Sequence, residues 1–198
     1  MNVPNRITVC RIILSVFLLI LMLLPLNKFG IVFPQLAVNN GNIIIYTKYI
    51  VCGIIFLVAA LTDFLDGYLA RKYNMVTDMG KVMDAIADKI LVNGVLIILA
   101  IDGFISPVVP VVIVCRDIAV DSIKMVAGSK SGAVGASMSG KVKTAVMLVG
   151  ITLLFFNDIP FILMGFRVSN ILILVATVLS VVSGVEYYIK NKKFIVEK

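Results

Sequence analysis

The chain has 198 residues, of which 61% are hydrophobic, and its mean hydropathy is +1.09. A soluble domain of this size does not require so much apolar surface, so the composition indicates an integral membrane protein. The net charge of +7 indicates membrane topology and anionic phospholipid rather than nucleic acid, because no basic patch is interleaved with aromatic residues. The sequence contains no histidine, which excludes imidazole acid–base chemistry and the usual zinc sites.

Six apolar stretches are candidates for bilayer-spanning helices, which need about 20 residues each. They cover residues 7–27, 46–70, 81–101, 107–126, 142–157 and 170–189, and polar or Gly- and Pro-containing breaks separate them. The first stretch lacks a small-residue cleavage site, so we expect a retained helix with an interfacial start near Pro4. The sequence therefore predicts one all-α membrane domain over residues 1–198, with six transmembrane helices.

The distribution of Lys and Arg predicts the orientation of these helices. Most of these residues fall at one set of helix ends, whereas Lys28, Lys48 and Arg167 fall at the opposite set. Because positive residues concentrate on the cytoplasmic side, we expect both termini in the cytoplasm, in agreement with an even number of spans. The connection around residues 71–80 then also lies in the cytoplasm. We therefore expect a multi-pass protein of the cytoplasmic membrane with a site that is reached from the cytosol.

Four aspartates stand at helical spacing on both sides of this connection. Asp63 and Asp66 share a face of the second helix, and Asp84 and Asp88 share a face of the third, because positions three and four apart are neighbours. A short connection makes the two helices antiparallel neighbours, so the two acidic faces can converge. Acids within membrane-spanning segments are unfavourable without partners, and we expect this group to have a function.

Small residues and cationic side chains accompany the acids. Gly67 and Gly80 remove side-chain bulk and allow a backbone or a ligand to approach closely. Several carboxylates in one pocket repel one another unless cations neutralise them, and oxygen-only ligands favour Mg²⁺ or Mn²⁺. Arg71 supplies a fork that can hold a phosphate oxygen. The alternative is that the acids only form salt bridges at helix ends with Arg71, Lys72, Lys81 and Lys89.

The run from Asp63 to Asp88 resembles the signature of the CDP-alcohol phosphatidyltransferases. It reads Asp-x2-Asp-Gly-x2-Ala-Arg-x8-Gly-x3-Asp-x3-Asp, and it matches that signature at every fixed position. The resemblance extends over most of the chain and implies a small six-helix membrane enzyme that forms a homodimer with a cytosol-facing pocket. In such an enzyme, a CDP-linked lipid gives its phosphatidyl group to an alcohol and CMP leaves.

The resemblance also implies roles for individual residues. Asp63, Asp66, Asp84 and Asp88 would hold two Mg²⁺ or Mn²⁺ ions, and Asp88 would act as the general base toward the attacking hydroxyl. The CDP-lipid would contact residues at the start of the chain and around the signature, namely Asn5, Arg6, Ile7, Thr8, Asp66, Gly67, Arg71 and Thr77. An interfacial helix start without ligand contact is the alternative for the N-terminal residues of this set.

Two further segments, Val3–Arg11 and Gly140–Thr144, are similar to the bacterial phosphatidylglycerophosphate synthases of that family. This similarity implies CDP-diacylglycerol as the donor and glycerol 3-phosphate as the acceptor. Asp121, Lys124 and Ala85 depart from the usual residues of that branch. The departures leave open another acceptor, such as inositol phosphate, phosphatidylglycerol or serine, and also an inactive relative that binds CDP-lipid without turnover.

An acceptor that carries its own phosphate needs cations beside the metal pocket. Arg116 lies inside an apolar helix, where a charge needs a partner, and Lys124 follows two turns later. Lys141 opens the next helix from the cytoplasmic side. We expect these three residues to bind the acceptor phosphate. The alternatives are that Arg116 pairs with Asp117, Asp121 or the acidic group, and that the lysines only set topology.

A transporter or channel that uses the carboxylates as a cation path is a different class of function. The acids gather near the predicted cytoplasmic ends of the helices, and no matching acids lie near the outer ends. A path across the bilayer would need polar groups along its length. The sequence therefore favours an enzyme over a transporter.

Overall fold

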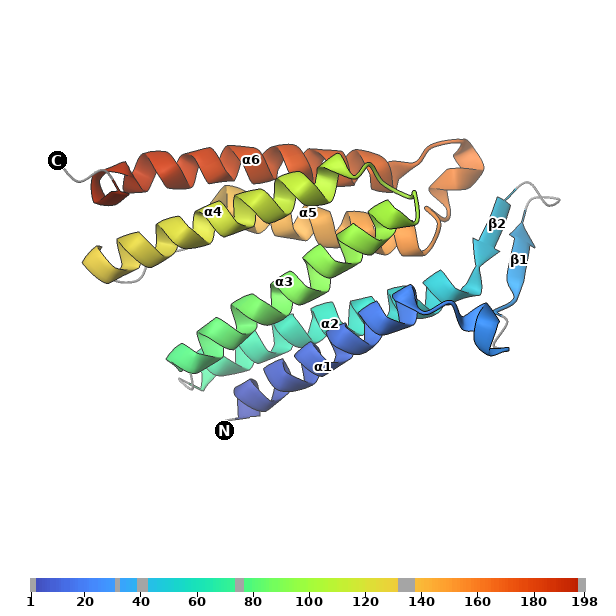
Figure 1. Cartoon of the computed structure of the whole chain (residues 1–198), viewed down its shortest axis with the longest axis horizontal. Coiled ribbons are helices and arrows are strands. Elements are labelled where there is room, and N and C mark those ends of the chain that lie inside the picture. Colours follow the sequence, from blue (N-terminus) through green and yellow to red (C-terminus); the bar gives the residue numbers. More distant parts are fainter. Residues whose placement is uncertain (1–2, 31–32, 39–42, 74–76, 132–137, 196–198) are drawn as a thin grey trace.

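The computed structural model describes residues 3–30, 33–38, 43–73, 77–131 and 138–195. All six predicted stretches form helices within these residues (Figure 1). The helices are α1 (Val3–Leu23), α2 (Thr47–Lys72), α3 (Asp78–Ile101), α4 (Val108–Ser131), α5 (Met138–Phe155) and α6 (Val168–Ile195).

A short hairpin departs from the all-α expectation. The strands β1 (Gln35–Val38) and β2 (Ile43–Tyr46) pair antiparallel between α1 and α2. Two 3-10 turns, Leu26–Phe29 and Phe161–Met164, lie in the connections that follow α1 and α5. The three consecutive isoleucines that begin β2 are β-branched residues, which suit a strand better than a helix. The hydropathy pattern did not reveal the hairpin, because this apolar run continues directly into α2.

The helices form two groups of three (Figure 1). In one group α1 packs against both α2 and α3, and in the other α6 packs against both α4 and α5. Contacts of α2 with α5 and of α3 with α4 join the two groups. The N-terminus and the C-terminus lie at the same end of the molecule, and the end of α2 and the start of α3 lie there too.

The two groups are held together by close packing near the opposite end, where α2 begins and α5 ends. The rings of Phe56 and Phe155 are buried there, with centroids 5.6 Å apart. Gly53, one turn before Phe56, makes this contact possible: a Cβ atom at that position would lie 2.8 Å from Cβ of Phe155. A small residue thus lets the two helices approach closely, as is common between membrane helices.

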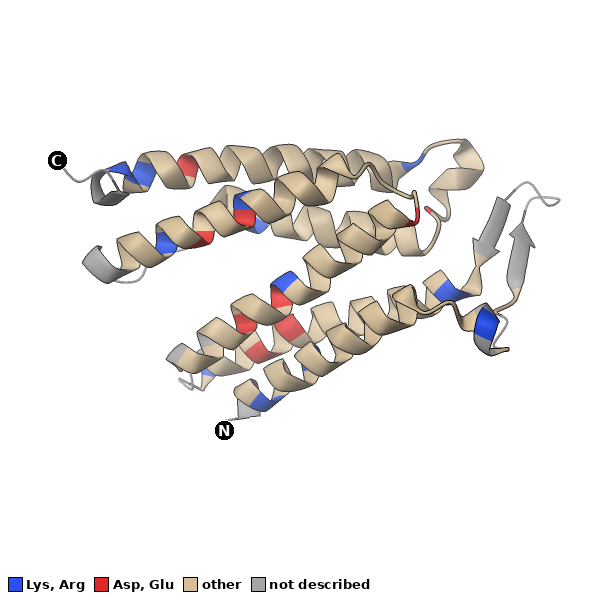
Figure 2. Ribbon diagram, in the orientation of Figure 1, with Lys and Arg blue, Asp and Glu red and all other residues tan. Residues whose placement is uncertain are grey.

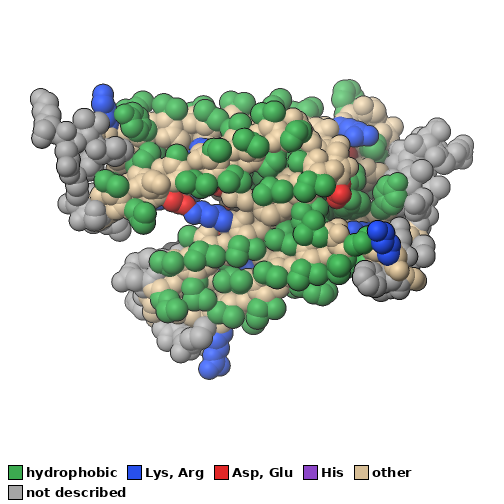
Figure 3. All heavy atoms as spheres, viewed as in Figure 1, with side chains coloured by type: hydrophobic (Ala, Val, Ile, Leu, Met, Phe, Trp, Pro, Cys, Tyr) green, Lys and Arg blue, Asp and Glu red, His purple; other side chains and the backbone are tan. Residues whose placement is uncertain are grey.

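Four of the described helices are long and apolar enough to cross a membrane. They contain the stretches Asn5–Leu23, Thr47–Ala70, Met138–Phe155 and Val168–Lys192. Both α3 and α4 have a comparable length but carry several charged residues. Hydrophobic side chains cover most of the face of the molecule seen in Figure 3. These features indicate a multi-pass membrane protein, whereas the six spans and the cytoplasmic location of the termini stay predictions.

Candidate active site

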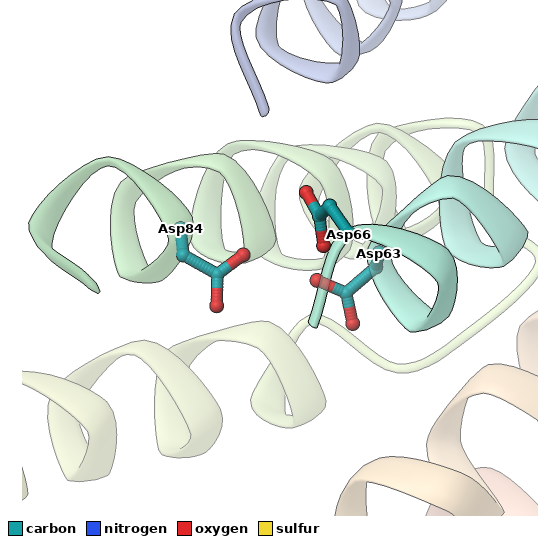
Figure 4. Close-up of side chains that lie close together, drawn as sticks. All are labelled: Asp63, Asp66 and Asp84. Carbon is teal, nitrogen blue, oxygen red and sulfur yellow. The ribbon is translucent and has the colours of Figure 1, made fainter. Parts of the chain in front are cut away.

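Three of the four predicted metal ligands converge in the structure. Asp63 and Asp66 come from α2, and Asp84 comes from α3, which runs back beside α2 (Figure 4). One carboxylate oxygen of each residue lies within 4.8 Å of the others. The Asp66 side chain is buried, but those of Asp63 and Asp84 are 44% and 50% exposed, so the cluster is open to solvent. Carboxylates this close repel one another unless a cation lies among them. We call these three residues the acid cluster.

An arginine that the sequence analysis did not select lies within the acid cluster. Arg11 of α1 is 1% exposed, and its Nη1 atom donates to Asp63 and, at 2.9 Å, to Asp84. Its Nη2 atom donates to Asp66. Thr8, one turn earlier on α1, donates from its hydroxyl to the same Asp66 carboxylate at 3.0 Å. The first helix therefore contributes Arg11 and Thr8 to the site. The position of Arg11 inside an apolar stretch was the feature of the sequence that could have identified it, because a charge there needs a partner.

The start of α3 is held by a second contact with α1. Thr77 caps α3, because its hydroxyl accepts from the backbone N–H of Gly80 at 3.0 Å, and Nδ2 of Asn5 donates to the same hydroxyl at 3.2 Å. A Cβ atom at Gly80 would lie 2.6 Å from Oδ1 of Asn5. Gly80 therefore leaves room for the Asn5 side chain, whereas the sequence analysis expected a backbone or a ligand to approach there. The first helix begins at Val3, so Asn5 lies in its first turn.

Asp88 lies one turn beyond Asp84 and outside the acid cluster. It lines a small polar pocket between α3, α4 and α5, together with Lys89, Asn93, Asp117, Lys143 and Thr144. Lys143 is buried, and its Nζ atom lies 3.3 Å from a carboxylate oxygen of Asp117. Lys143 is not among the predicted site residues, although the segment Gly140–Thr144 contains it, because its burial depends on how α5 is rotated toward α3. The role of Asp88 as a fourth metal ligand stays a prediction.

The three predicted phosphate-binding cations have different surroundings. Arg116 donates from Nη1 to Asp117 at 2.9 Å and from Nε to the Ser180 carbonyl at 2.9 Å, and Nη2 donates to the Ser183 hydroxyl. One of the alternatives for Arg116, an ion pair with Asp117, is therefore present in the structure. Its other two hydrogen bonds are to residues of α6. Lys124 lies over the ring of Tyr187 in α6, with its Nζ atom 5.2 Å from the centroid. The Lys141 side chain is exposed.

The remaining predicted residues belong to α1 and α2. Ile7 and Gly67 are half-buried, and Arg6 is exposed. The side chain of Arg71 lies outside the described residues. Lys89 and Asp121, on α3 and α4, form an ion pair across the two groups of helices.

Apart from Lys48 in the first turn of α2, the charged residues of α2, α3 and α4 gather in the half of the molecule nearer the termini (Figure 2). Figure 3 shows a hollow between the two groups of helices in the same half, with acidic and basic side chains at its edges. The acid cluster belongs to the α1–α3 group, whereas Asp117 and Lys143 belong to the α4–α6 group. Asp88 lies between them, since it lines the pocket that both groups form.

Comparison with known proteins agrees with this geometry. A model of the CDP-alcohol phosphatidyltransferase family matches residues 1–182. The chain belongs to the CDP-alcohol phosphatidyltransferase family. The acid cluster, Asp88 and the polar pocket all lie within the matched residues.

Several curated relatives in this family carry the name CDP-diacylglycerol–glycerol-3-phosphate 3-phosphatidyltransferase. The protein of that name from Bacillus subtilis (strain 168) is 36% identical over 190 residues, which are 96% of this chain and 95% of the relative. The one from Rickettsia bellii (strain RML369-C) is 31% identical over 202 residues, covering 98% and 97% of the two chains. The one from Mycoplasma genitalium is 37% identical over 150 residues, covering 76% of this chain and 63% of the relative.

Members of the CDP-alcohol phosphatidyltransferase family depend on divalent metal ions, and the acid cluster suits such ions. Its ligands are carboxylate oxygens, the type of donor that Mg²⁺ and Mn²⁺ prefer. Two of its side chains are partly exposed, so a phosphate-bearing substrate can share the ion with them. The residues present therefore fit a divalent metal.

Proposed function

We propose that the chain transfers the phosphatidyl group of CDP-diacylglycerol to sn-glycerol 3-phosphate, giving phosphatidylglycerophosphate and CMP. The single observation that carries this proposal is the convergence of Asp63, Asp66 and Asp84 within a chain of this family. The relatives that carry the name of this reaction cover nearly the whole chain, which supports the choice of substrates. The enzyme would act as a homodimer in the cytoplasmic membrane, with its site open to the cytosol.

The acid cluster, together with Asp88, would hold two Mg²⁺ or Mn²⁺ ions. When bound, these ions would neutralise the pyrophosphate of the donor and stabilise the charge on departing CMP. The carboxylates of Asp63 and Asp84 are the more exposed ligands, and so they are the ones able to share an ion with the substrate.

Asp88 is the proposed general base. The acceptor hydroxyl oxygen forms a bond to the phosphorus of the phosphatidyl group, and the bond from this phosphorus to the bridging oxygen breaks. CMP leaves with that electron pair, and the Asp88 carboxylate takes the hydroxyl proton. The position of Asp88, between the acid cluster and the polar pocket, supports this role because it adjoins both the donor and the acceptor side.

The donor would bind along the edge that α1 shares with α2 and α3. Two contacts support a common surface there, namely Asn5 with Thr77 and Thr8 with Asp66. All four residues belong to the proposed CDP-lipid set, whose other members are Arg6, Ile7, Gly67 and Arg71. Contacts between them would order the surface before the nucleotide arrives, which lowers the entropy lost on binding.

The acceptor phosphate would bind to cations of α4 and α5. Arg116 has five N–H donors, and the bonds described for it use three, which leaves donors for a phosphate oxygen. Lys124 and Lys141 are the other predicted cations. We add Lys143, because it is buried in the same pocket as Asp88, where the reacting hydroxyl must lie.

The test is CMP release by the purified protein in detergent, with CDP-diacylglycerol, Mg²⁺ or Mn²⁺, and each candidate acceptor in turn. We expect CMP only with glycerol 3-phosphate, and we expect it to disappear on chelation. CMP formed only with inositol phosphate, phosphatidylglycerol or serine would keep the chemistry and replace the acceptor. Binding of CDP-diacylglycerol without CMP release for any acceptor would contradict the proposed activity.

A further inference from the structure

Arg11 occupies the point at which the acid cluster converges. One nitrogen, Nη1, donates to carboxylates of two different helices, Asp63 of α2 and Asp84 of α3. The second, Nη2, donates to Asp66. A divalent ion held by the same carboxylates would compete with these nitrogens, because Mg²⁺ and Mn²⁺ would use the same oxygens as ligands.

Charge also makes the guanidinium and a metal ion exclude each other. Arg11 is buried, so its positive charge is neutralised by the acid cluster rather than by water. Removing it without replacement would leave carboxylates in repulsion, one of them buried. Adding a divalent ion beside it would place two cations in contact. The cluster therefore accommodates one or the other.

The position of Arg11 is not ideal for the arginine itself. Its Nε atom is buried and has no hydrogen-bond partner among the described residues. A buried donor without a partner destabilises the arrangement that contains it. The buried Nε atom therefore reduces the net stabilisation that Arg11 gains from its three ion pairs.

We propose that Arg11 competes with divalent ions for the acid cluster. Its guanidinium neutralises the three carboxylates in the metal-free protein, and a divalent ion binds by displacing it. This inference rests on the proposed function, because it takes the acid cluster as the metal ligands. Arg11 thereby stabilises the metal-free protein and lowers its affinity for the ion. A higher concentration of the ion is therefore needed to occupy the site than without Arg11.

Mn²⁺ binding and thermal unfolding test the proposal on the full chain in detergent. Bound Mn²⁺ is measured from the loss of the electron paramagnetic resonance signal of the free hydrated ion. For Arg11→Met we expect the Kd for Mn²⁺ to fall about tenfold or more. The Tm of the metal-free variant should fall by roughly 5 °C, and Mn²⁺ should raise it more than in the wild type.

Two further variants make the result interpretable. Arg11→Lys keeps a positive charge but has no fork to bridge the carboxylates, so its Kd should lie between those of the wild type and Arg11→Met. If Arg11→Met does not fold, the Kd of Arg11→Lys for Mn²⁺ tests the proposal in its place. Arg167→Gln removes one positive charge from an exposed position between α5 and α6, and its Kd should equal that of the wild type.

Two outcomes would overturn the inference. If the wild type binds Mn²⁺ and both Arg11 variants bind it equally or more weakly, Arg11 supports the ligands and does not compete. That outcome leaves the proposed function intact. If neither the wild type nor any variant binds Mn²⁺, the acid cluster is not a metal site, and the inference and the proposed function fail together.

Discussion

At the scale of single residues, the acids of the signature occupy two different environments. Asp63, Asp66 and Asp84 share Arg11, whereas Asp88 points to a pocket that holds Lys143 and Asn93. Acids that share a cation are suited to hold a metal. A carboxylate beside them, on the side of the polar pocket, is suited to receive a proton.

Replacing Asp88 by Asn therefore tests the division of roles. At saturating Mg²⁺, we expect kcat to fall about 10²- to 10⁴-fold, because the amide cannot take the hydroxyl proton. The Tm should change little, and CDP-diacylglycerol should still bind at saturating Mg²⁺, because the acid cluster keeps three of the four proposed ligands. Asp102→Asn is the matched control, since Asp102 is exposed at the other end of α3 and bonds to the Tyr49 hydroxyl. Wild-type turnover by Asp88→Asn would remove Asp88 as the base.

At the scale of elements, helix-to-helix contacts decide where the polar side chains point. Arg116 joins α4 to α6 through Ser180 and Ser183, and Gly184 leaves space for it, since a Cβ atom there would lie 3.1 Å from Cγ of Arg116. The guanidinium is thus a link between two helices and, in the proposed function, also a ligand of the acceptor phosphate.

The substitution Arg116→Lys separates these two roles. A lysine ammonium group cannot reproduce the three hydrogen bonds of the Arg116 guanidinium. We therefore expect the Tm to fall and the free energy of unfolding to decrease by about 1–3 kcal/mol. If Arg116 also binds the acceptor, the KM for glycerol 3-phosphate should rise about tenfold. Steady-state kinetics and thermal unfolding of the same preparation measure both. A lower Tm with an unchanged KM would restrict Arg116 to its structural role.

The helices and the acid cluster could be predicted from the sequence because they depend on local spacing. Apolar stretches of sufficient length gave all six helices, and a separation of three residues put Asp63 and Asp66 on one face. The parts that depend on packing could not be predicted. Arg11 reaches the acids only because α1 lies against both α2 and α3. Lys143 becomes buried only because of the rotation of α5, and no spacing in the sequence records that rotation.

At the scale of the whole molecule, the two groups of helices are packed together at one end and hollowed at the other (Figure 3). The close contact at Gly53 and Phe155 lies where α2 begins and α5 ends. The acid cluster lies away from this contact, in the later half of α2 and the first half of α3. The relative position of the two groups, and hence the width of the site, depends on this packing.

Gly53→Ala tests this dependence. The added Cβ atom would lie 2.8 Å from Cβ of Phe155, so the helices must separate, and we expect a loss of about 1–3 kcal/mol in stability with a clearly lower Tm. Turnover should fall as well, although Gly53 is far from the acids along α2. Gly128→Ala is the matched control, because nothing lies within 4 Å of a Cβ atom there. Equal Tm values for the two variants would contradict the prediction.

The separation into two groups of helices has a consequence for how this enzyme can change. The acid cluster and the donor edge lie in α1–α3, and the cations proposed for the acceptor lie in α4 and α5. Under the proposed function, substitutions in α4 and α5 should alter the choice of alcohol and leave the transfer chemistry intact. A chimaera that joins α1–α3 of this chain to α4–α6 of a relative with another acceptor would then be expected to use that relative's alcohol.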